Sequence, residues 1–156
     1  MSEFRWHAEQ QAEAATKLRS FPINLGEIRR TVTHILSQFG RGLMFEEYTV
    51  HDISHIDDML NMLSWLIPES TQAQLTKAEW LMIVLSAYFH DMGLIVTEEE
   101  YNNRAMSGFE NFCEGALFAA PGGQDYKNKI SILAEDKRNR FLYQEFVRAN
   151  HGRRVR

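Results

Sequence analysis

Residues 80–94 read WLMIVLSAYFHDMGL, an apolar run that ends in a histidine–aspartate pair and a glycine. The apolar part, residues 80–89, is about half of the ~20 residues that a helix needs to cross a bilayer, so it predicts a helix buried in a protein core. Gly93 follows the pair and is typical of the position just after a helix. His90 and Asp91 are therefore expected at the carboxyl end of a buried helix.

The start of this helix carries a capping signal. Thr76 is followed three residues later by Glu79, as in a capping box, so the helix is expected over about 77–90. Its apolar stripe predicts core packing and not a surface for a cofactor. The stripe consists of Trp80, Ile83, Val84 and Tyr88.

Helical patterns continue on both sides of this stretch, and no segment alternates with a period of two for long. Asn24 after Pro22 fits an N-cap, and Thr97 before three glutamates fits another helix start. The expected helices span about 2–19, 25–39, 50–66, 77–90, 97–118 and 127–150. We therefore predict an all-α fold of about six helices with little or no sheet.

Length and composition bound the class of protein. A chain of 156 residues with 44% hydrophobic and 24% charged residues is typical of one globular domain with a real core. Its net charge of −4 argues mildly against a long nucleic-acid duplex as partner, because such binding depends on phosphate contacts. Cys113 is the single cysteine, which excludes an intrachain disulfide and suits a reducing cytosol. We find no signal peptide or membrane span and expect a cytoplasmic location.

A second polar cluster, YTVHDISHIDDM, occupies residues 48–59. Its His51 and His55 are four residues apart, so a helix places both on one face. Together with His90 and Asp91 they offer imidazole and carboxylate donors, a set that suits Mn²⁺, Fe, Zn²⁺, Ni²⁺ or Co²⁺. An ion held by His55, His90 and Asp91 keeps open positions that activate water and polarise a phosphoryl oxygen. His51 has the titration range of a general acid for a leaving alkoxide.

Other interpretations of these four residues stay open. His55, His90 and Asp91 alternatively form a buried polar network or a site that has lost its activity. His51 alternatively begins a helix or supplies a hydrogen bond that orients a ligand.

The remaining aspartates and histidines near these motifs are expected to have structural roles. Asp52, Asp57 and Asp58 are expected to cap or solvate a helix start, with Asp58 alternatively orienting the neighbouring ligand histidine. His7 and His34 are expected to be structural or merely exposed.

The motifs HDISHIDDML at 51–60 and LSAYFHDMGL at 85–94 resemble the HD superfamily of metal-dependent phosphohydrolases, which is named for its His-Asp doublet. The interval of 35 residues from His55 to His90 is typical of small HD domains. Cyclic-nucleotide phosphodiesterases, a branch of the superfamily, carry Tyr-His-Asn-x-x-His, and His51-Asp52-x-x-His55 is similar with aspartate in place of asparagine. The resemblance implies an HD helical bundle with His55, His90 and Asp91 as metal ligands. It implies His51 as general acid, and Asp91 is also counted as catalytic.

The resemblance covers roughly residues 45–156. This part is expected to form the metal-site core of a single domain over residues 1–156, with residues 1–44 as N-terminal helices. The motifs are most similar to HD domains at the N-terminus of larger bacterial proteins, some of them fused to ATPase domains. The chain is therefore expected to be an N-terminal piece of a longer protein or a domain that ends near its last site residue.

The ligand set of the superfamily is closed by a later aspartate, which this sequence does not clearly supply. After Asp91 the chain has only Asp125, in an expected loop, and Asp136, on an expected solvated helix face. His151 follows Arg148 by three residues, and some HD proteins use such a downstream histidine for a second metal or the substrate phosphate. His151 and Arg148 are therefore candidate substrate-binding residues, because guanidinium matches phosphate oxygens. A basic helix end is the alternative interpretation.

The leading hypothesis is a metal-dependent phosphohydrolase or phosphodiesterase acting on a nucleotide or another phosphoester, with Mn, Fe, Zn, Ni, Co or Mg as cofactor. The second hypothesis is a catalytically incomplete HD domain that serves as a nucleotide- or metal-binding sensor. A paired-iron oxygenase comes last, because it needs more ligands than the sequence shows. The expected partner is a small-molecule phosphoester or nucleotide, with a C-terminal domain or a second copy of the chain also considered. Nucleic acid is not favoured, and no membrane partner is expected.

Overall fold

The structure is a computed structural model that describes residues 4–37, 52–116, 119 and 122–154. Within these residues helices dominate and no strand occurs, which confirms the predicted all-α HD bundle. The described chain divides into two compact units, the first ending at Asp91 and the second starting at Met92. No described helix is both long enough and apolar enough to cross a membrane. The single domain over residues 1–156 stays a prediction.

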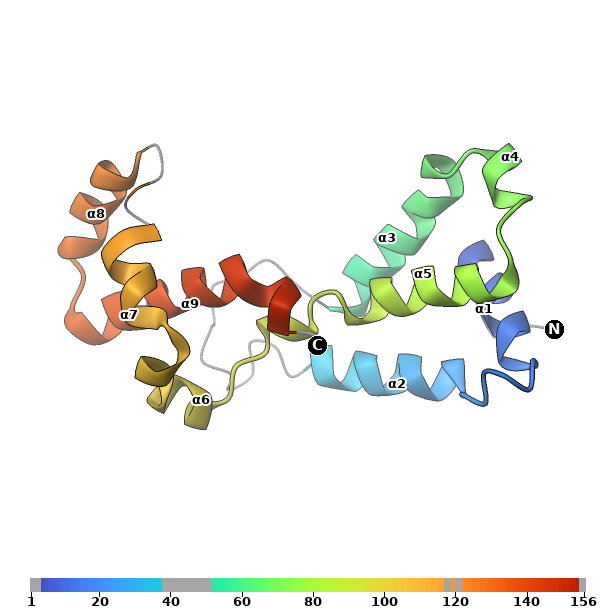
Figure 1. The fold of residues 1–156 in the computed structure, drawn as a ribbon, viewed down its shortest axis with the longest axis horizontal. Coiled ribbons are helices and arrows are strands. Elements are labelled where there is room, and N and C mark those ends of the chain that lie inside the picture. The colour runs from blue at the N-terminus through green and yellow to red at the C-terminus, as the bar shows by residue number, and fades with distance from the viewer. Residues whose placement is uncertain (1–3, 38–51, 117–118, 120–121, 155–156) are drawn as a thin grey trace. The chain divides into compact units, whose positions relative to one another are not determined.

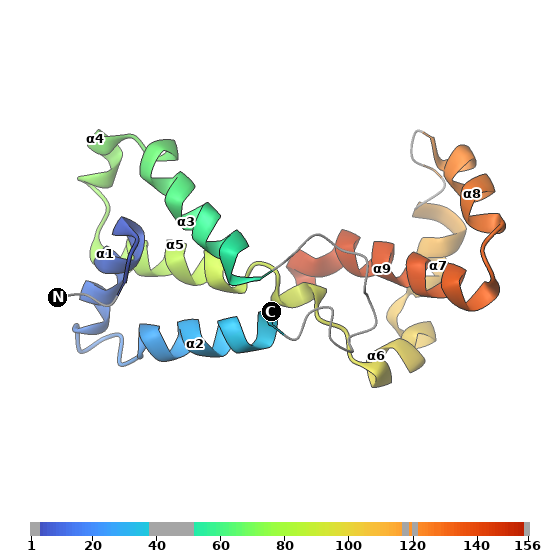
Figure 2. The same ribbon diagram turned by 180° about the vertical axis from the view of Figure 1, so that it is seen from behind.

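The described part of the first unit is built around one central helix. Its helices are α1 (His7–Thr16), α2 (Leu25–Leu36), α3 (Ile53–Leu66), α4 (Glu69–Gln72) and α5 (Lys77–Phe89). Helix α5 contacts α1, α2 and α3, and both views of the ribbon show it running between α2 and α3 (Figures 1 and 2). The apolar face of α5 supplies much of the core of this unit, and the opposite face, which carries Glu79, Met82 and Ser86, is exposed to water.

The core of the first unit contains three of the four residues of the predicted apolar stripe, and the fourth, Ile83, is half-buried. Trp80, Val84 and Tyr88 are at most 2% exposed. Helix α1 packs most extensively against α5, and its buried face is made of small side chains that let two helices approach closely. These small residues are Ala8, Ala12 and Ala15.

Three predicted helix starts are confirmed. The Asn24 side chain accepts a hydrogen bond from a backbone N–H of α2, and Thr97 does the same for α6 (Glu98–Asn102). Thr76 and Glu79 form the capping box of α5. These bonds satisfy backbone groups that have no partner inside the helix, and they link residues only three apart. Local sequence therefore predicts them well.

Some boundaries in the first unit differ from the prediction. Helix α1 ends at Thr16 and not near residue 19. Helix α3 begins at Ile53 because the side chain of Asp52 accepts a hydrogen bond from the backbone of Ser54 and caps it. The sequence did not predict α4, since four residues are too few to show helical periodicity.

The second unit contains short helices and one long one. Its described elements are η1 (Met92–Leu94), α6, η2 (Arg104–Ser107), α7 (Phe109–Asn111), η3 (Phe112–Ala116), α8 (Gly123–Ser131) and α9 (Glu135–Arg154). The continuous helix predicted over 97–118 is wrong, because α6 already ends at Asn102. Gly108, with a left-handed φ of +82°, then separates η2 from α7. The continuous helix predicted over 127–150 is also wrong. The chain turns after Ser131, and the acidic residues at 135–136 favour a new first turn.

Arg154, near the end of α9, joins three parts of the second unit. Its guanidinium donates to the carbonyl oxygens of Gly93 at 2.6 Å and Ile95 at 2.9 Å and forms an ion pair with Glu100. Tyr143 donates to the same carboxylate at 3.2 Å. The C-terminal turn of α9 is thereby fixed to η1 and α6.

This contact predicts a pH dependence of stability. The hydrogen bond from Arg154 lowers the pKa of Glu100, so the charged carboxylate stabilises the folded state. The stabilisation is complete above the ordinary glutamate pKa of 4.5 and is lost as pH falls below it and through the lower folded pKa. The melting temperature of Glu100→Gln should therefore lie below that of the wild type at neutral pH and approach it in acid. Circular dichroism measures the melting temperatures of both proteins at each pH.

The matched control for this prediction is Glu99→Gln, which changes an exposed residue of the same helix. Its melting temperature should parallel that of the wild type at every pH. A difference between Glu100→Gln and the wild type that stays constant down to acid pH would contradict the assignment.

Candidate metal centre

Three donor groups of the first unit converge. His55 lies in the first turn of α3, His90 caps the C-terminus of α5, and Asp91 follows it. Nε2 of His90 is 3.3 Å from Nε2 of His55 and 2.9 Å from Oδ2 of Asp91. Nε2 of His55 is 3.7 Å from the same oxygen. One ligand atom from each residue lies within 4.8 Å of the others, so the three predicted ligands are together.

The ring of His90 is oriented by its own helix. Its Nδ1 lies 2.8 Å from the carbonyl oxygen of Ala87, and since a carbonyl only accepts, Nδ1 carries the hydrogen. In the neutral ring the lone pair therefore sits on Nε2, facing Asp91. Nε2 of His90 and Oδ2 of Asp91 are then both acceptors 2.9 Å apart, so they need a shared cation between them, either a proton or a metal ion. The hydrogen bond to Asp91 accordingly raises the pKa of His90, and burial offsets part of the rise.

The group fits a divalent metal ion by its chemistry and its burial. The Asp91 side chain is 10% exposed, and a carboxylate so buried requires compensating positive charge. The His55 side chain is 42% exposed, so the group can be reached from that side. Two imidazoles and a carboxylate suit Mn, Fe, Zn, Ni or Co. Over the described parts of the chain, no other group of three His, Cys, Asp or Glu side chains is placed to hold an ion.

The predictions for three residues around His55 have different outcomes. His51, the candidate general acid, lies outside the described residues. Asp52 caps α3, as expected. The expectation that Asp57 caps or solvates the helix start is wrong, because Asp57 accepts hydrogen bonds from Trp6 and Arg29. Helix α1 and helix α2 bring these donors to it, which no local pattern shows.

The candidate substrate-binding residues His151 and Arg148 belong to the second unit. Nδ1 of His151 donates to the carbonyl oxygen of Arg148 at 2.7 Å, which leaves Nε2 of His151 as acceptor in the neutral ring. Arg148 is exposed and its guanidinium pairs with Glu145 at 2.9 Å. Arg148 keeps N–H groups that can donate to a phosphate oxygen, whereas Nε2 of His151 can donate to one only in the imidazolium form of the ring. The role of both residues stays a prediction. The nearby Arg154 is engaged in its bonds to Gly93 and Glu100.

The two late aspartates lie on helix starts in the second unit. Asp125 is in the first turn of α8, where the sequence predicted a loop. Asp136 is exposed in the first turn of α9 and pairs with Arg140 at 3.2 Å, as a solvated helix face should. Neither belongs to the described ligand group, so the closing aspartate is not identified among the described residues.

Sequence reasoning missed a buried carboxylate in the first unit. Glu9 is 1% exposed and pairs with Arg29 at 2.5 Å. It stands among good helix formers, where a glutamate is expected at the surface. The one usable signal is its spacing of three from Ala12, which places it on the alanine face that α1 buries.

A comparison with known protein families gives one match. The family model HD-CE matches residues 45–156, which is most of the chain. The match includes His55, His90 and Asp91, and it leaves out α1 and α2. No curated protein and no solved structure matches the chain.

Proposed function

The chain belongs to the HD-CE family, and from this premise we propose that it is a metal-dependent phosphohydrolase or phosphodiesterase acting on a nucleotide or another phosphoester. The observation that carries the proposal is the convergence of His55, His90 and Asp91. The family match supports it because an HD-type domain has this histidine–aspartate set. The small-molecule substrate and the cytoplasmic location are parts of the same proposal.

The donor atoms that would hold the ion are Nε2 of His55, Nε2 of His90 and Oδ2 of Asp91. When bound, a divalent ion lowers the pKa of water and polarises a phosphoryl oxygen. The carbonyl of Ala87 keeps the Nε2 lone pair of His90 pointed at this position. Asp91 supplies the negative charge that balances the ion.

The remaining proposed roles concern the substrate. His51 donates a proton to the leaving oxygen, because its pKa range allows a proton to be held at neutral pH. Arg148 donates to the phosphate oxygens, and His151 donates to one through Nε2 in its imidazolium form. To bind phosphate, Arg148 would give up its exposed ion pair with Glu145. The cost is small, because exposed ion pairs contribute little to stability.

Metal content tests the proposal first. Elemental mass spectrometry should find about one transition-metal ion per chain in the wild type and none in His90→Ala. His34→Ala, which removes an exposed histidine of α2, should keep the ion. The metal-loaded wild type should then hydrolyse at least one member of a panel of nucleotides, cyclic nucleotides and aryl phosphodiesters, and His90→Ala should not. No ion after soaking in Mn²⁺, or turnover that His90→Ala leaves unchanged, would overturn the proposal.

A sensor that binds a nucleotide or metal without turnover is the second candidate function. It is favoured by Asp125 and Asp136, which both stand outside the described ligand group. Saturable nucleotide binding with no product after prolonged incubation would support the sensor, and metal-dependent hydrolysis would exclude it.

A further inference from the structure

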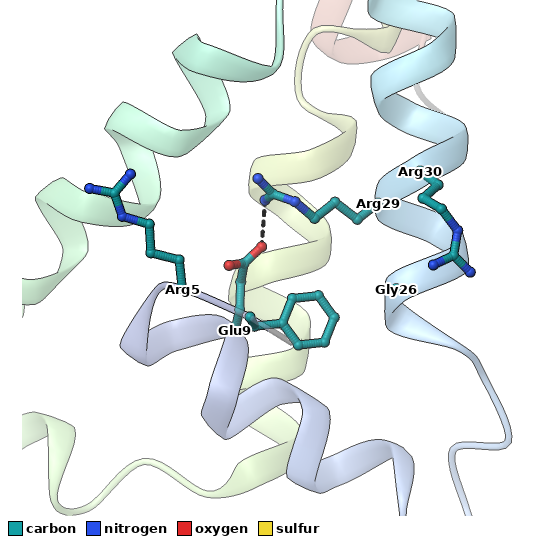
Figure 3. A pocket seen from close by; sticks show the side chains of 6 residues that line it. Arg5, Glu9, Gly26, Arg29 and Arg30 are labelled. Carbon is teal, nitrogen blue, oxygen red and sulfur yellow. Dashed lines mark hydrogen bonds and ion pairs between the residues drawn. The ribbon is translucent and has the colours of Figure 1, made fainter. Parts of the chain in front are cut away.

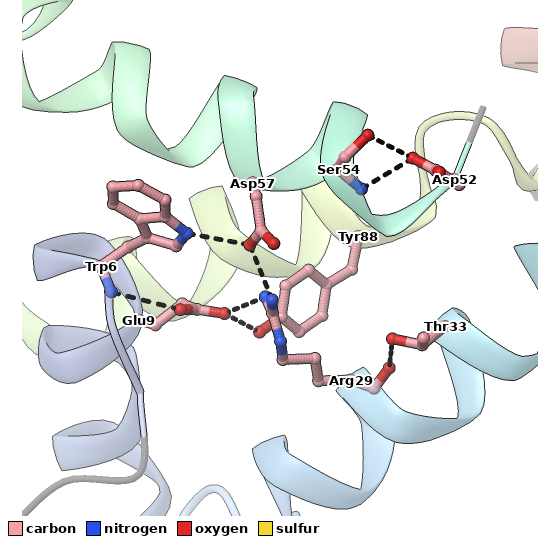
Figure 4. A network of polar contacts seen from close by, with 8 residues as sticks. All are labelled: Trp6, Glu9, Arg29, Thr33, Asp52, Ser54, Asp57 and Tyr88. Atoms are coloured by element: carbon pink, nitrogen blue, oxygen red, sulfur yellow. Dashed lines mark hydrogen bonds and ion pairs between the residues drawn. The ribbon is translucent and has the colours of Figure 1, made fainter. Parts of the chain in front are cut away.

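A network of charged and polar side chains joins four helices of the first unit (Figure 4). Arg29 of α2 stands at its centre, with Nη1 at 2.5 Å from Oε1 of Glu9 and Nη2 at 2.6 Å from Oδ1 of Asp57. The hydroxyl of Tyr88, on α5, donates to the same Glu9 oxygen at 2.6 Å. Nε1 of Trp6 donates to Asp57 at 2.8 Å. The network thus ties α2 to α1, α3 and α5.

The network is largely removed from water. Glu9 and Tyr88 are each 1% exposed, and the Arg29 side chain is 23% exposed. Burial alone would lower the pKa of Arg29, but Asp57, Tyr88 and Glu9 outweigh it and raise that pKa. Burial and the bond to Glu9 raise the pKa of Tyr88, so its hydroxyl stays a donor.

The network forms hydrogen bonds with both helices that position the histidine ligands. Asp57 follows His55 by two residues on α3, and Tyr88 precedes His90 by two residues at the end of α5. Residues two apart on a helix differ by about 200° in direction and about 3 Å in height. The network therefore bonds to each helix within one turn of its histidine ligand, on the opposite face of that helix. Arg29 and Glu9 complete the link between the two helices, since Arg29 binds Asp57 and Glu9 binds Tyr88.

We propose that Glu9 and Arg29 are positioning residues of the candidate metal centre, which set the separation of His55 from His90 by fixing α3 against α5. The proposal rests on the proposed function, because it concerns the same metal group. The distances from a metal ion to its ligands must lie within about 0.2 Å of their usual values. Apolar packing alone allows larger shifts of one helix along another, whereas short charged hydrogen bonds have one geometry. Both residues lie outside the segment that the HD-CE family model matches.

A cavity beside the network is lined by both Arg29 and a control residue, Arg30. It has a volume of about 240 Å³ and is lined by Phe4, Arg5, Glu9, Gly26, Arg29 and Arg30. Figure 3 shows the Arg29 guanidinium bonded to Glu9 while that of Arg30 points away from it. Arg30 is exposed, neighbours Arg29 in sequence and has the same chemistry, so it supplies the matched control.

The experiment compares Arg29→Met with Arg30→Met in two measurements. Titration with Co²⁺, followed by visible absorption at a temperature far below unfolding, gives the dissociation constant and the spectrum of the saturated site. Carbon–proton NMR of the histidine rings reports on His55 and His90 in the metal-free protein. Arg29→Met should raise the Co²⁺ dissociation constant about tenfold, change the saturated spectrum and move both histidine signals. Arg30→Met should do none of these.

A purely structural role for Arg29 would overturn the proposal. In that case Arg29→Met would melt at a lower temperature but keep the Co²⁺ affinity, the saturated spectrum and both histidine signals. If the wild type binds no Co²⁺, the metal centre fails, and the histidine signals alone decide whether Arg29 positions the two helices. If Arg29→Met does not fold, Glu9→Gln with Glu13→Gln as control, and the double variant Glu9→Gln/Arg29→Met, undergo the same two measurements.

Discussion

Alanine in place of Gly93 is expected to destabilise the second unit by about 3 kcal/mol, the upper part of the range for overpacked sites. A Cβ at Gly93 would lie 2.1 Å from the carbonyl oxygen of His151 and 2.8 Å from its carbonyl carbon. Both are backbone atoms of α9, so no side chain can rotate to make room. The last turn of α9 must move, and with it the bonds of Arg154 to Gly93 and Ile95.

The measurement is chemical denaturation with hydrogen exchange resolved by residue. Gly93→Ala should lower the free energy of unfolding and reduce amide protection in the last turn of α9. Gly152→Ala is the matched control, because Gly152 lies in the same helical turn and its Cβ would meet nothing within 4 Å. Alanine there should stabilise the helix by up to about 1 kcal/mol. Equal stability of Gly93→Ala and the wild type would contradict the contact between η1 and α9.

Methionine in place of Arg29 is expected to lower the free energy of unfolding by about 3 kcal/mol. The loss comes mainly from Glu9, whose carboxylate is 1% exposed and would lose its charged partner. Asp57 adds less, because 32% of its side chain is exposed and water can solvate it. Methionine keeps most of the apolar stem of Arg29, so the change removes charge and hydrogen bonds more than volume.

Neutralising Glu9 in the same chain should restore part of this loss. In Glu9→Gln/Arg29→Met no unpaired charge remains buried at position 9, so the double variant should be more stable than Arg29→Met alone. Urea unfolding of both single variants and the double variant measures the coupling. Arg30→Met, at an exposed position, should change stability by less than about 0.5 kcal/mol. Additive effects at positions 9 and 29 would contradict a direct ion pair.

Each part of the candidate metal centre carries a local signal, and the resemblance to the HD superfamily implied that the two parts meet. The doublet His90-Asp91 ends an apolar helix, and His55 lies near the start of another helix with its own apolar stripe. The sequence also predicted the start of α5, since a capping box links residues three apart. It could not predict which nitrogen of His90 faces the group, because that depends on the carbonyl of Ala87 in the folded helix.

The errors in the second unit have a different physical cause. The sequence around Gly108 has helix formers on both sides, and an isolated glycine inside such a pattern is often tolerated. Only the packed structure shows that α6 ends at Asn102 and that Gly108 takes φ +82° between η2 and α7. The turn after Ser131 likewise has no proline or glycine to mark it.

Hydrophobic periodicity and contacts between close neighbours in the chain were enough to predict the all-helical class, the main helices of the first unit and three caps. The grouping of His55, His90 and Asp91 was implied by the resemblance of their motifs to the HD superfamily, because no local pattern links residues 35 positions apart. The tertiary structure alone decided that Glu9 is buried against Arg29 and that Gly93 must admit the backbone of His151. Such contacts depend on which helix faces meet, and a buried charge is stable only where a distant partner reaches it.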